Sequence, residues 1–130
     1  MTARGITLDT GALVAIERRK QRGTQLLDLA RRRLAILSVP VPVITEWWRG
    51  RTDVRERILD AVNIEPLSLA VAKSAGEALA GVARSTALDA IVMAFAASRG
   101  DVVFTGDRDD LERLRSFFPT VRVLGCGGEP

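Results

Sequence analysis

Short β-type runs alternate with helical patterns along nearly the whole chain, and this alternation limits the possible folds more than any other feature of the sequence. Strands that alternate with helices form βαβ crossovers, which build a parallel sheet with helices on both faces. We therefore predict an α/β fold with a central parallel sheet of about five strands. The strand-like runs are residues 5–8, 35–39, 64–67, 102–104 and 121–124.

Helices are predicted between these runs from apolar residues at helical spacing and from start and stop signals. Pro42 suits the first turn of one helix, and Ser68 suits the N-cap of another. Either Ser85 or Thr86 caps the most apolar helix, and Gly100 ends it. The predicted helices are residues 12–16, 24–34, 44–48, 53–62, 69–83, 87–98 and 110–117.

The length of 130 residues and a hydrophobic fraction of 47% fit one compact domain with a single continuous core. We expect this domain to cover residues 1–124 and a flexible, Gly-rich C-terminal tail to cover residues 125–130. The longest apolar run is far shorter than the ~20 residues that a membrane span needs, and no secretion signal opens the chain. We therefore expect a soluble, cytoplasmic protein.

The residue types that the chain lacks narrow the possible chemistry. Without any His, the chain has no imidazole base, no Ser–His–Asp triad and no His-ligated zinc. The single Cys, Cys126, rules out an intramolecular disulfide and a CxxC site, and we expect an inert thiol there. There is also no Tyr. Catalysis would have to use carboxylates, hydroxyls, Lys or Arg, together with a hard metal.

Four acidic residues fall at positions that a parallel sheet would bring to one edge. Asp9 directly follows the first strand, and Asp107 follows the fourth. Glu46 lies on the helix after the second strand, and Asp89 opens the apolar helix before the fourth. Ligands of open α/β sheets bind beyond the carboxyl ends of the strands. Carboxylates gathered there repel one another unless a cation lies between them, and all-oxygen ligands favour Mg²⁺ or Mn²⁺.

Each of these acids also has a purely structural interpretation. Asp9 could cap the helix that begins after it, and Asp107 could cap the last helix. Asp89 lies three residues after Thr86, which is the spacing of a capping box, and Glu46 could be a solvated helix residue. The case for a site rests on all four falling at compatible positions. Accessory candidates are Asp110, Thr105 and Thr10.

At four segments, in order, the chain resembles the PIN-domain family, and in particular the VapC-type toxins of bacterial toxin–antitoxin pairs. Each segment is short, but together they span the chain from Asp9 to Leu111 at family-like spacing. The matching segments are residues 8–15 (LDTGALVA), 43–46 (VITE), 87–92 (ALDAIV) and 103–111 (VFTGDRDDL).

The resemblance implies a three-layer PIN-like fold, with helices around the parallel sheet, and a magnesium site that cuts RNA phosphodiesters. It implies that Asp9, Glu46, Asp89 and Asp107 are the catalytic and metal-binding residues, with Asp110 as the alternative fourth ligand. It also implies a homodimer, and a heteromer with a small co-encoded antitoxin that inhibits the enzyme. The protein would then be the toxin of a type II toxin–antitoxin system.

The formal net charge of +3 suits a polyanionic partner, although a solvated surface explains it equally well. We expect the Arg31–Arg33 cluster to be a solvated helix face. Of the adjacent Trp47 and Trp48, one should pack in the core, leaving the other for a base or, preferably, a protein interface. The candidates for contacts to RNA phosphates are Arg49, Arg51, Arg84 and Arg108.

Three other functions compete with a ribonuclease. A phospho-receiver domain needs an acceptor Asp after the third strand and a Lys after the fifth, and this chain has neither. A catalytically inactive binding module with the PIN fold would use the acids as helix caps. A DNA-directed nuclease would use the same metal site, since no residue visibly recognises the 2′-hydroxyl that distinguishes RNA.

Overall fold

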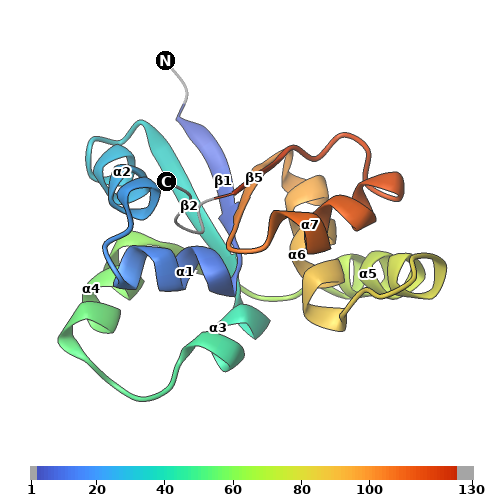
Figure 1. The fold of residues 1–130 in the computed structure, drawn as a ribbon, viewed down its shortest axis with the longest axis horizontal. Coiled ribbons are helices and arrows are strands. Elements are labelled where there is room, and N and C mark those ends of the chain that lie inside the picture. The colour runs from blue at the N-terminus through green and yellow to red at the C-terminus, as the bar shows by residue number, and fades with distance from the viewer. Residues whose placement is uncertain (1–2, 126–130) are drawn as a thin grey trace.

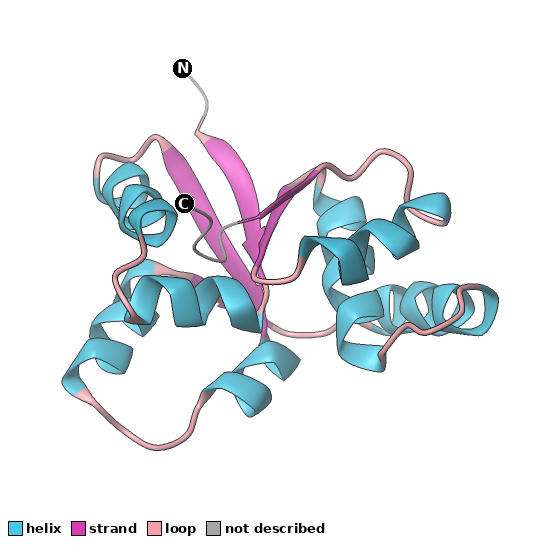
Figure 2. Cartoon of the chain, viewed as in Figure 1, coloured by secondary structure: helices cyan, strands magenta, loops and turns pink. Residues whose placement is uncertain are grey.

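A parallel sheet forms the middle layer of the protein, between two layers of helices (Figure 2). The computed structural model describes residues 3–125. Within that range every strand pairs in parallel, as the sequence predicts. The strands are β1 (Arg4–Leu8), β2 (Ala35–Pro40), β3 (Asn63–Glu65), β4 (Val102–Thr105) and β5 (Val123–Gly125).

The strand order β3-β2-β1-β4-β5 places β1 at the centre of the sheet. In register, Ile6 of β1 lies beside Leu37 of β2 on one side and Val102 of β4 on the other. The chain runs outward from β1 to β3, and then crosses back to add β4 and β5. Strand order therefore reverses between β1 and β4, and in open α/β sheets a crevice forms at the carboxyl ends of such strands.

The helices cover both faces of the sheet. Helices α1, α2 and α4 pack together on one side, and α5 and α6 pack together on the other (Figure 1). In the part of the chain that the structure describes, the helices are α1 (Thr10–Glu17), α2 (Gln21–Arg31), α3 (Val41–Trp47), α4 (Asp53–Ala61), α5 (Leu69–Gly81), α6 (Ala87–Arg99), α7 (Arg108–Glu112) and the 3₁₀ helix η1 (Arg113–Ser116). This arrangement confirms the predicted α/β class.

Burial explains the apolar character of the central elements. Ile6 and Leu8 of β1 are buried, and so is Thr7 between them, because helices cover both faces of this strand. Helix α6 is buried along most of its length, including Met93 and Phe95, which accounts for its unusually apolar sequence. The core of the domain therefore lies on both sides of β1.

Three predicted helix boundaries are confirmed. The Ser68 hydroxyl accepts a hydrogen bond from the backbone N–H of Val71 and caps α5. Thr86, rather than Ser85, caps α6, and Gly100 ends α6 in the left-handed conformation, at a φ of 71°. Short polar residues at the start and glycine at the end therefore marked these helices correctly.

Other boundaries differ from the prediction for local reasons. Helix α2 ends at Arg31 rather than at residue 34, because the chain turns through Arg33, at a φ of 59°, to enter β2. Strand β3 ends before Pro66, which has no N–H to donate to a neighbouring strand. The last predicted helix is instead α7 followed by η1, and β5 covers Val123–Gly125 rather than residues 121–124.

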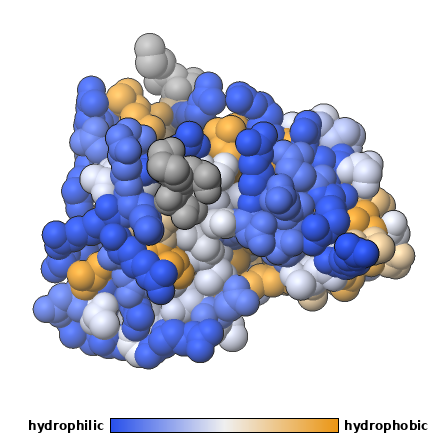
Figure 3. All heavy atoms as spheres, in the orientation of Figure 1, coloured by the Kyte–Doolittle hydropathy of each residue, from blue (hydrophilic) through white to orange (hydrophobic). Residues whose placement is uncertain are grey.

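The surface seen in Figure 3 is largely hydrophilic, with an apolar area at the end of the molecule formed by α5. On this helix Leu69 is 70% exposed and Leu79 is 37% exposed. Over the described range, no helix is long and apolar enough to cross a membrane. Gly125, predicted to begin the flexible tail, is instead the last residue of β5, because it pairs with Thr105 of β4. Cys126 and the other residues of the predicted tail, 127–130, lie outside the described residues.

Candidate active site

A cavity of about 390 Å³ is lined by all four predicted acids and by the accessory candidate Asp110. We call it the acid cavity. The acids reach it from five different places, because Asp9 follows β1, Asp107 follows β4, and the other three lie on α3, α6 and α7. The structure thus brings together residues that are up to 101 positions apart in the chain, next to the reversal in strand order. Its lining residues are Asp9, Thr10, Gly11, Glu46, Thr86, Leu88, Asp89, Val92, Gly106, Asp107 and Asp110.

Asp9 is the most firmly held of these acids. Its Oδ1 accepts hydrogen bonds from the backbone N–H groups of Ala12, at 2.8 Å, and Gly106, at 3.3 Å. Its Oδ2 accepts a hydrogen bond from the hydroxyl of Thr105, which is fully buried. The first of these bonds caps α1, so the structural interpretation of Asp9 is also realised. The same bonds tie β1, α1 and the end of β4 to one carboxylate.

Two glycines allow this close contact between distant segments. A Cβ on Gly11 would lie 2.5 Å from the Cα of Gly106, and a Cβ on Gly106 would lie 2.7 Å from the Cα of Gly11. Any side chain at either position would therefore push α1 away from the turn after β4. The glycines keep Asp9 within reach of the Gly106 N–H.

Burial raises the pKa values of Asp9 and Asp89, and the charges of neighbouring acids add to the effect. Burial is the main cause of the raised pKa of Asp9, and the charge of Glu46 adds to it. Burial also raises the pKa of Asp89 to about 6, and the charges of Asp110, Asp9 and Glu46 contribute. The backbone N–H of Asp89 donates to the Thr86 hydroxyl, so this residue also belongs to the cap of α6. Metal-free, the cavity is therefore a site of excess negative charge.

Asp107 and Asp110 have different neighbours, although both line the cavity. Asp107 is exposed, and its Oδ1 accepts the backbone N–H of Asp110 at 3.3 Å, which caps α7. Asp110 is bound by the guanidinium of Arg113 at 2.6 Å, and this hydrogen bond is the main reason that its pKa is lowered. Asp107 thus has no ion pair within the described range, whereas Asp110 forms one with Arg113.

The chemistry of the cavity suits a divalent cation. Within residues 3–125, no Lys or Arg forms an ion pair with Asp9, Glu46, Asp89 or Asp107. The same residues contain no group of three acidic side chains that could hold a metal as they stand, so the acids share a cavity without forming a ready-made ligand cluster. Mg²⁺ accepts such a site, because it keeps several waters and binds directly to one or two carboxylates.

The two predicted hydroxyl residues have different positions. Thr105 lies behind Asp9 rather than in the cavity lining, and its Oγ1 also accepts the backbone N–H of Asp107 at 2.9 Å. Thr10 lines the cavity, and its buried Oγ1 has no hydrogen-bond partner in the described part of the chain. Thr105 therefore positions two of the acids, and the Thr10 hydroxyl is buried beside the cavity without a hydrogen-bond partner among the described residues.

The predicted phosphate-binding arginines are not equivalent in the structure. Arg49 lines a second cavity together with Glu46, and its Nε donates to the carbonyl of Glu46 at 3.0 Å. Arg51 is paired with Asp53 and Glu56, and Arg108 is bonded to Glu112. Arg84 lies in the turn between α5 and α6, away from the acid cavity lining. Of these four arginines, Arg49 alone lies beside the acids without an ion pair to any carboxylate in the described range.

Sequence reasoning did not predict this second cavity, which measures about 350 Å³ and shares Thr10 and Glu46 with the acid cavity, and it missed Glu17, Arg18 and Arg55. Arg18 lines it from the end of α1, and Arg55 lines it from α4. Thr10, Val14 and Arg18 are spaced four residues apart, so helical spacing would have placed them on one face of α1. No sequence pattern could have placed Arg55 in this cavity, because its position depends on how α4 packs against the rest of the domain. The cavity is lined by Thr10, Val14, Glu17, Arg18, Glu46, Trp47, Arg49 and Arg55.

The two tryptophans divide as the sequence suggested, with one in the core. Trp47 is 2% exposed, and its Nε1 donates to Glu17 at 3.0 Å. Trp48 is half-buried and packs against the core, edge to face with Trp47, with ring centroids 6.0 Å apart. The rings touch because α3 ends at Trp47, and helical spacing no longer separates the next residue.

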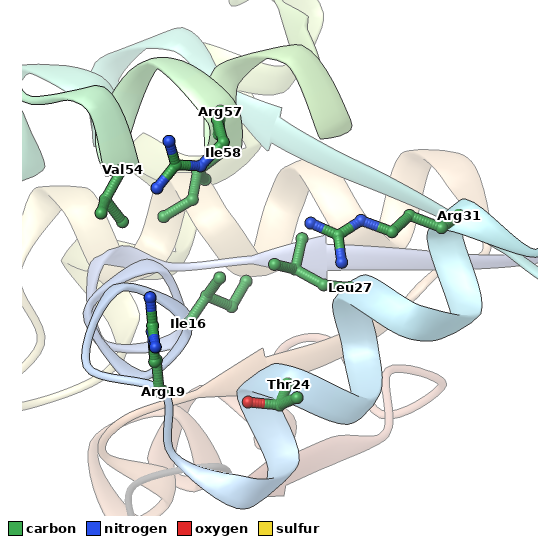
Figure 4. A pocket seen from close by; sticks show the side chains of 8 residues that line it. All are labelled: Ile16, Arg19, Thr24, Leu27, Arg31, Val54, Arg57 and Ile58. Carbon is green, nitrogen blue, oxygen red and sulfur yellow. The ribbon is translucent and has the colours of Figure 1, made fainter.

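A third cavity, of about 330 Å³, lies between α1, α2 and α4. Figure 4 shows an apolar floor of Ile16, Leu27, Val54 and Ile58, surrounded by arginines. We call it the α1/α2/α4 groove. Its lining residues are Ile16, Arg19, Thr24, Leu27, Arg31, Val54, Arg57 and Ile58. Arg31, expected on a solvated face, therefore also borders a groove.

The fold and the acid cavity define a class of protein, namely an open parallel α/β domain with a carboxylate site at the strand-order reversal. The family model of the PIN domain matches residues 6–116, which is most of the chain. The chain belongs to the PIN-domain family. PIN domains are generally nucleases and typically use divalent metal ions.

Several solved structures are similar to this chain. One is a chain of VapBC2 from Rickettsia felis, in a complex bound to a DNA fragment from the VapBC2 promoter. It matches with a TM-score of 0.71 and 15% identity, over 93% of this chain and 98% of that one. A chain of DNA-bound VapBC from Salmonella typhimurium matches with a TM-score of 0.70 and 19% identity, over 96% and 98%. PAE2754 from Pyrobaculum aerophilum matches with a TM-score of 0.58 and 21% identity, over 95% and 92%. At these sequence identities the similarity shows a shared fold and nothing further. No curated protein matches in sequence.

Proposed function

We propose that this chain is a magnesium-dependent endoribonuclease and the toxin of a type II toxin–antitoxin pair, with Mn²⁺ as an alternative metal. One observation carries the enzymatic part of the proposal. Asp9, Glu46, Asp89 and Asp107 line one cavity, and no cationic side chain within residues 3–125 pairs with any of them. Burying these carboxylates and gathering their charges disfavours the metal-free fold, as the raised pKa of Asp89 indicates, and this cost is typical of a functional site.

In this mechanism Asp9, Asp89 and Asp107 would hold the metal directly, and Glu46 would bind it through water or orient the attacking water. A bound Mg²⁺ would lower the pKa of a coordinated water and neutralise charge on the phosphate. Asp9 is fixed in place by its three hydrogen bonds, so it would offer a ligand that does not have to be ordered when the metal binds. Glu46 is exposed, and it is free to contact the water and the substrate.

The test is cleavage of total RNA by the purified protein with Mg²⁺, with and without EDTA. Asp89→Asn should lower kcat by about 100-fold or more, because a ligand carboxylate is lost. Asp109→Asn is the matched control, since Asp109 is an exposed acid in the first turn of α7 that does not line the cavity. Absence of cleavage by the wild-type protein, or equal activity in both variants, would reject the assignment.

The same assay decides between Asp107 and Asp110 as the fourth ligand. We expect Asp107→Asn to be the more damaging change, because Asp107 has no ion pair in the described range and Asp110 is already bound to Arg113. A larger loss in Asp110→Asn would reverse this choice. A DNA oligonucleotide of the same sequence, assayed in parallel, tests the choice of RNA over DNA as the substrate.

The partner in this proposal is a small antitoxin that binds the α1/α2/α4 groove. Two of the similar structures are VapBC toxin–antitoxin complexes. The groove has an apolar floor, and Arg19, Arg31 and Arg57 line it without a carboxylate partner among the described residues. These features suit a segment that has apolar residues flanked by acidic ones.

Replacing Arg31 and Arg57 together with Glu should weaken capture of the co-encoded antitoxin by at least about tenfold, through repulsion between like charges. Unchanged affinity would remove the groove from the proposal. We also propose a homodimer, in which a second copy covers exposed Leu69 and Leu79 of α5. Sedimentation of the wild-type protein and of Leu69→Glu would test this contact, and a monomeric wild-type protein would contradict it.

A further inference from the structure

The acid cavity and the second cavity are adjacent, and arginines line the second cavity but not the first. The two share Thr10 and Glu46, so they meet at the start of α1 and the end of α3. On one side of this boundary lie the carboxylates, and on the other lie the guanidinium groups of Arg18, Arg49 and Arg55. A strand with regularly spaced phosphates could therefore place one phosphate on each side.

The arginines of the second cavity are not equally committed to the fold. Arg55 is structural, since its Nη2 pairs with Glu17 at 3.0 Å and its Nη1 donates to the Gly50 carbonyl at 2.8 Å. Glu17 in turn accepts a hydrogen bond from buried Trp47, so Arg55 and Glu17 together form a braced wall. Arg55 neutralises Glu17, and the wall adds little net charge.

Arg18 and Arg49 supply the unbalanced positive charge. Both are exposed, and neither forms an ion pair in the described part of the chain. Arg49 is oriented by the bond from its Nε to the carbonyl of Glu46, which leaves its terminal nitrogens without a partner in that range. Two guanidinium groups beside one wall form a surface suited to a phosphodiester.

We propose that Arg18 and Arg49 bind the RNA phosphate adjacent to the one that is cut, so that the strand crosses from the acid cavity over Thr10 into the second cavity. This inference rests on the proposed ribonuclease function, and it adds a defined path and a positioning role for two residues. These contacts hold the backbone in register and do not recognise bases.

The test uses Asp89→Asn full-length protein, which does not consume its ligand, and a short, fluorescently labelled single-stranded RNA. In this background, Arg18→Ala and Arg49→Ala should each weaken binding by about fivefold to tenfold and make the salt dependence of log K shallower by about 0.7 per lost contact. Arg4→Ala is the matched control. It removes one exposed positive charge at the start of β1, which is the opposite edge of the sheet, and it should change binding less than twofold.

A second measurement locates the contact along the strand. RNAs that carry one neutral methylphosphonate linkage, moved stepwise past the cleavage position, are bound to the Arg18→Ala and parent proteins. If Arg18 binds one particular phosphate, neutralising that linkage weakens RNA binding by the parent protein severalfold and hardly changes binding by the Arg18→Ala protein. Neutralising any other linkage then changes RNA binding equally in the two proteins. Effects that are additive at every linkage would overturn the proposal.

These outcomes separate the inference from the function on which it rests. If the wild-type protein cuts RNA but Arg18→Ala and Arg49→Ala bind as Arg4→Ala does, the phosphate site is wrong and the nuclease stands. If position-specific coupling is found in a protein that never cuts RNA, the two arginines bind a phosphate as proposed, but the nuclease and the placement beside a cut linkage are wrong. If the protein binds no RNA at all, both are rejected.

Discussion

At the scale of single residues, the carboxylate of Asp9 both caps α1 and lines the acid cavity. Its Oδ1 accepts the backbone N–H groups of Ala12 and Gly106, and its Oδ2 is held by Thr105. Asp107 and the backbone N–H of Asp89 also take part in helix caps. Capping and ligand binding are therefore not alternatives in this protein, because the caps fix the positions from which the acids reach the cavity.

Thr105 offers a direct test of this positioning. Thr105→Val removes the hydroxyl that donates to Asp9 and accepts from the N–H of Asp107, and it leaves both partners without that bond. We expect the free energy of unfolding to fall by about 1–3 kcal/mol, as for other buried groups that lose a partner. Thr105→Ser keeps the hydroxyl and should lose less stability. Chemical denaturation measures both, and equal losses in the two variants would contradict the role of the hydroxyl.

Asp89 makes the stability of the metal-free protein depend on pH. Its pKa is raised to about 6 from the ordinary value of 3.8, so the unfolded chain ionises first as the pH rises. The free energy of unfolding should therefore fall between about pH 4 and pH 6 and level off above that. Asp9 contributes in the same direction.

Asp89→Asn should flatten this dependence and stabilise the metal-free protein at pH 7 by about 1 kcal/mol, after allowance for solvent screening of a partly buried side chain. Urea unfolding at several pH values in EDTA measures the effect, with Asp109→Asn as the control. A pH profile in Asp89→Asn as steep as that of the wild type would argue against burial as the source of the shift.

At the scale of elements, the contact between the start of α1 and the turn after β4 depends on two glycines facing each other. Gly11→Ala would place its Cβ 2.5 Å from the Cα of Gly106, which is backbone and cannot rotate away. We expect a loss of stability of about 1–3 kcal/mol and a large loss of cleavage, because Asp9 moves relative to Asp107. Gly76→Ala, on α5, meets no atom within 4 Å and should be neutral or stabilising. Thermal unfolding and cleavage assays of both variants check this.

The elements also show what the sequence could reveal. The strand-like runs and the caps at Ser68 and Thr86 are local signals, and they predicted the sheet and the starts of α5 and α6 correctly. The ends of α2 and β3 depend on how the chain enters its neighbours, so they were misplaced by a few residues. The sequence could predict that Asp9 and Asp107 lie close together, because each follows a strand and the carboxyl ends of parallel strands lie at the same edge of a sheet. It could not predict the wall formed by Glu17, Trp47 and Arg55, because this wall depends on the packing of α1, α3 and α4.

At the scale of the whole molecule, the strand order 3-2-1-4-5 sets where the site lies. The central strand leads into Asp9, and the strand added after the return crossing leads into Asp107. Acids from both halves of the sheet therefore meet at one edge, where their mutual repulsion disfavours the metal-free fold. A cation that binds between them should stabilise the entire domain, because the ligands belong to elements on both sides of the sheet.

We expect Mg²⁺ or Mn²⁺ to raise the free energy of unfolding by about 1.4 kcal/mol at a free concentration ten times the Kd. Ca²⁺ and NaCl at matched ionic strength separate a specific site from general screening. The Asp9→Asn protein should show a reduced response, while Asp109→Asn responds as the wild type does. An identical response in all three proteins, or none in the wild type, would count against a metal site. Differential scanning calorimetry provides the measurement.

The acid cavity draws on residue 9, near the beginning of the chain, and on residues 107 and 110, close to its end. Asp107 and Asp110 both come after β4, so the cavity needs segments about a hundred positions apart. A truncated or half-translated copy that stops before β4 has no complete acid cavity. In the proposed ribonuclease, activity would therefore require that β4 and α7 are folded against β1.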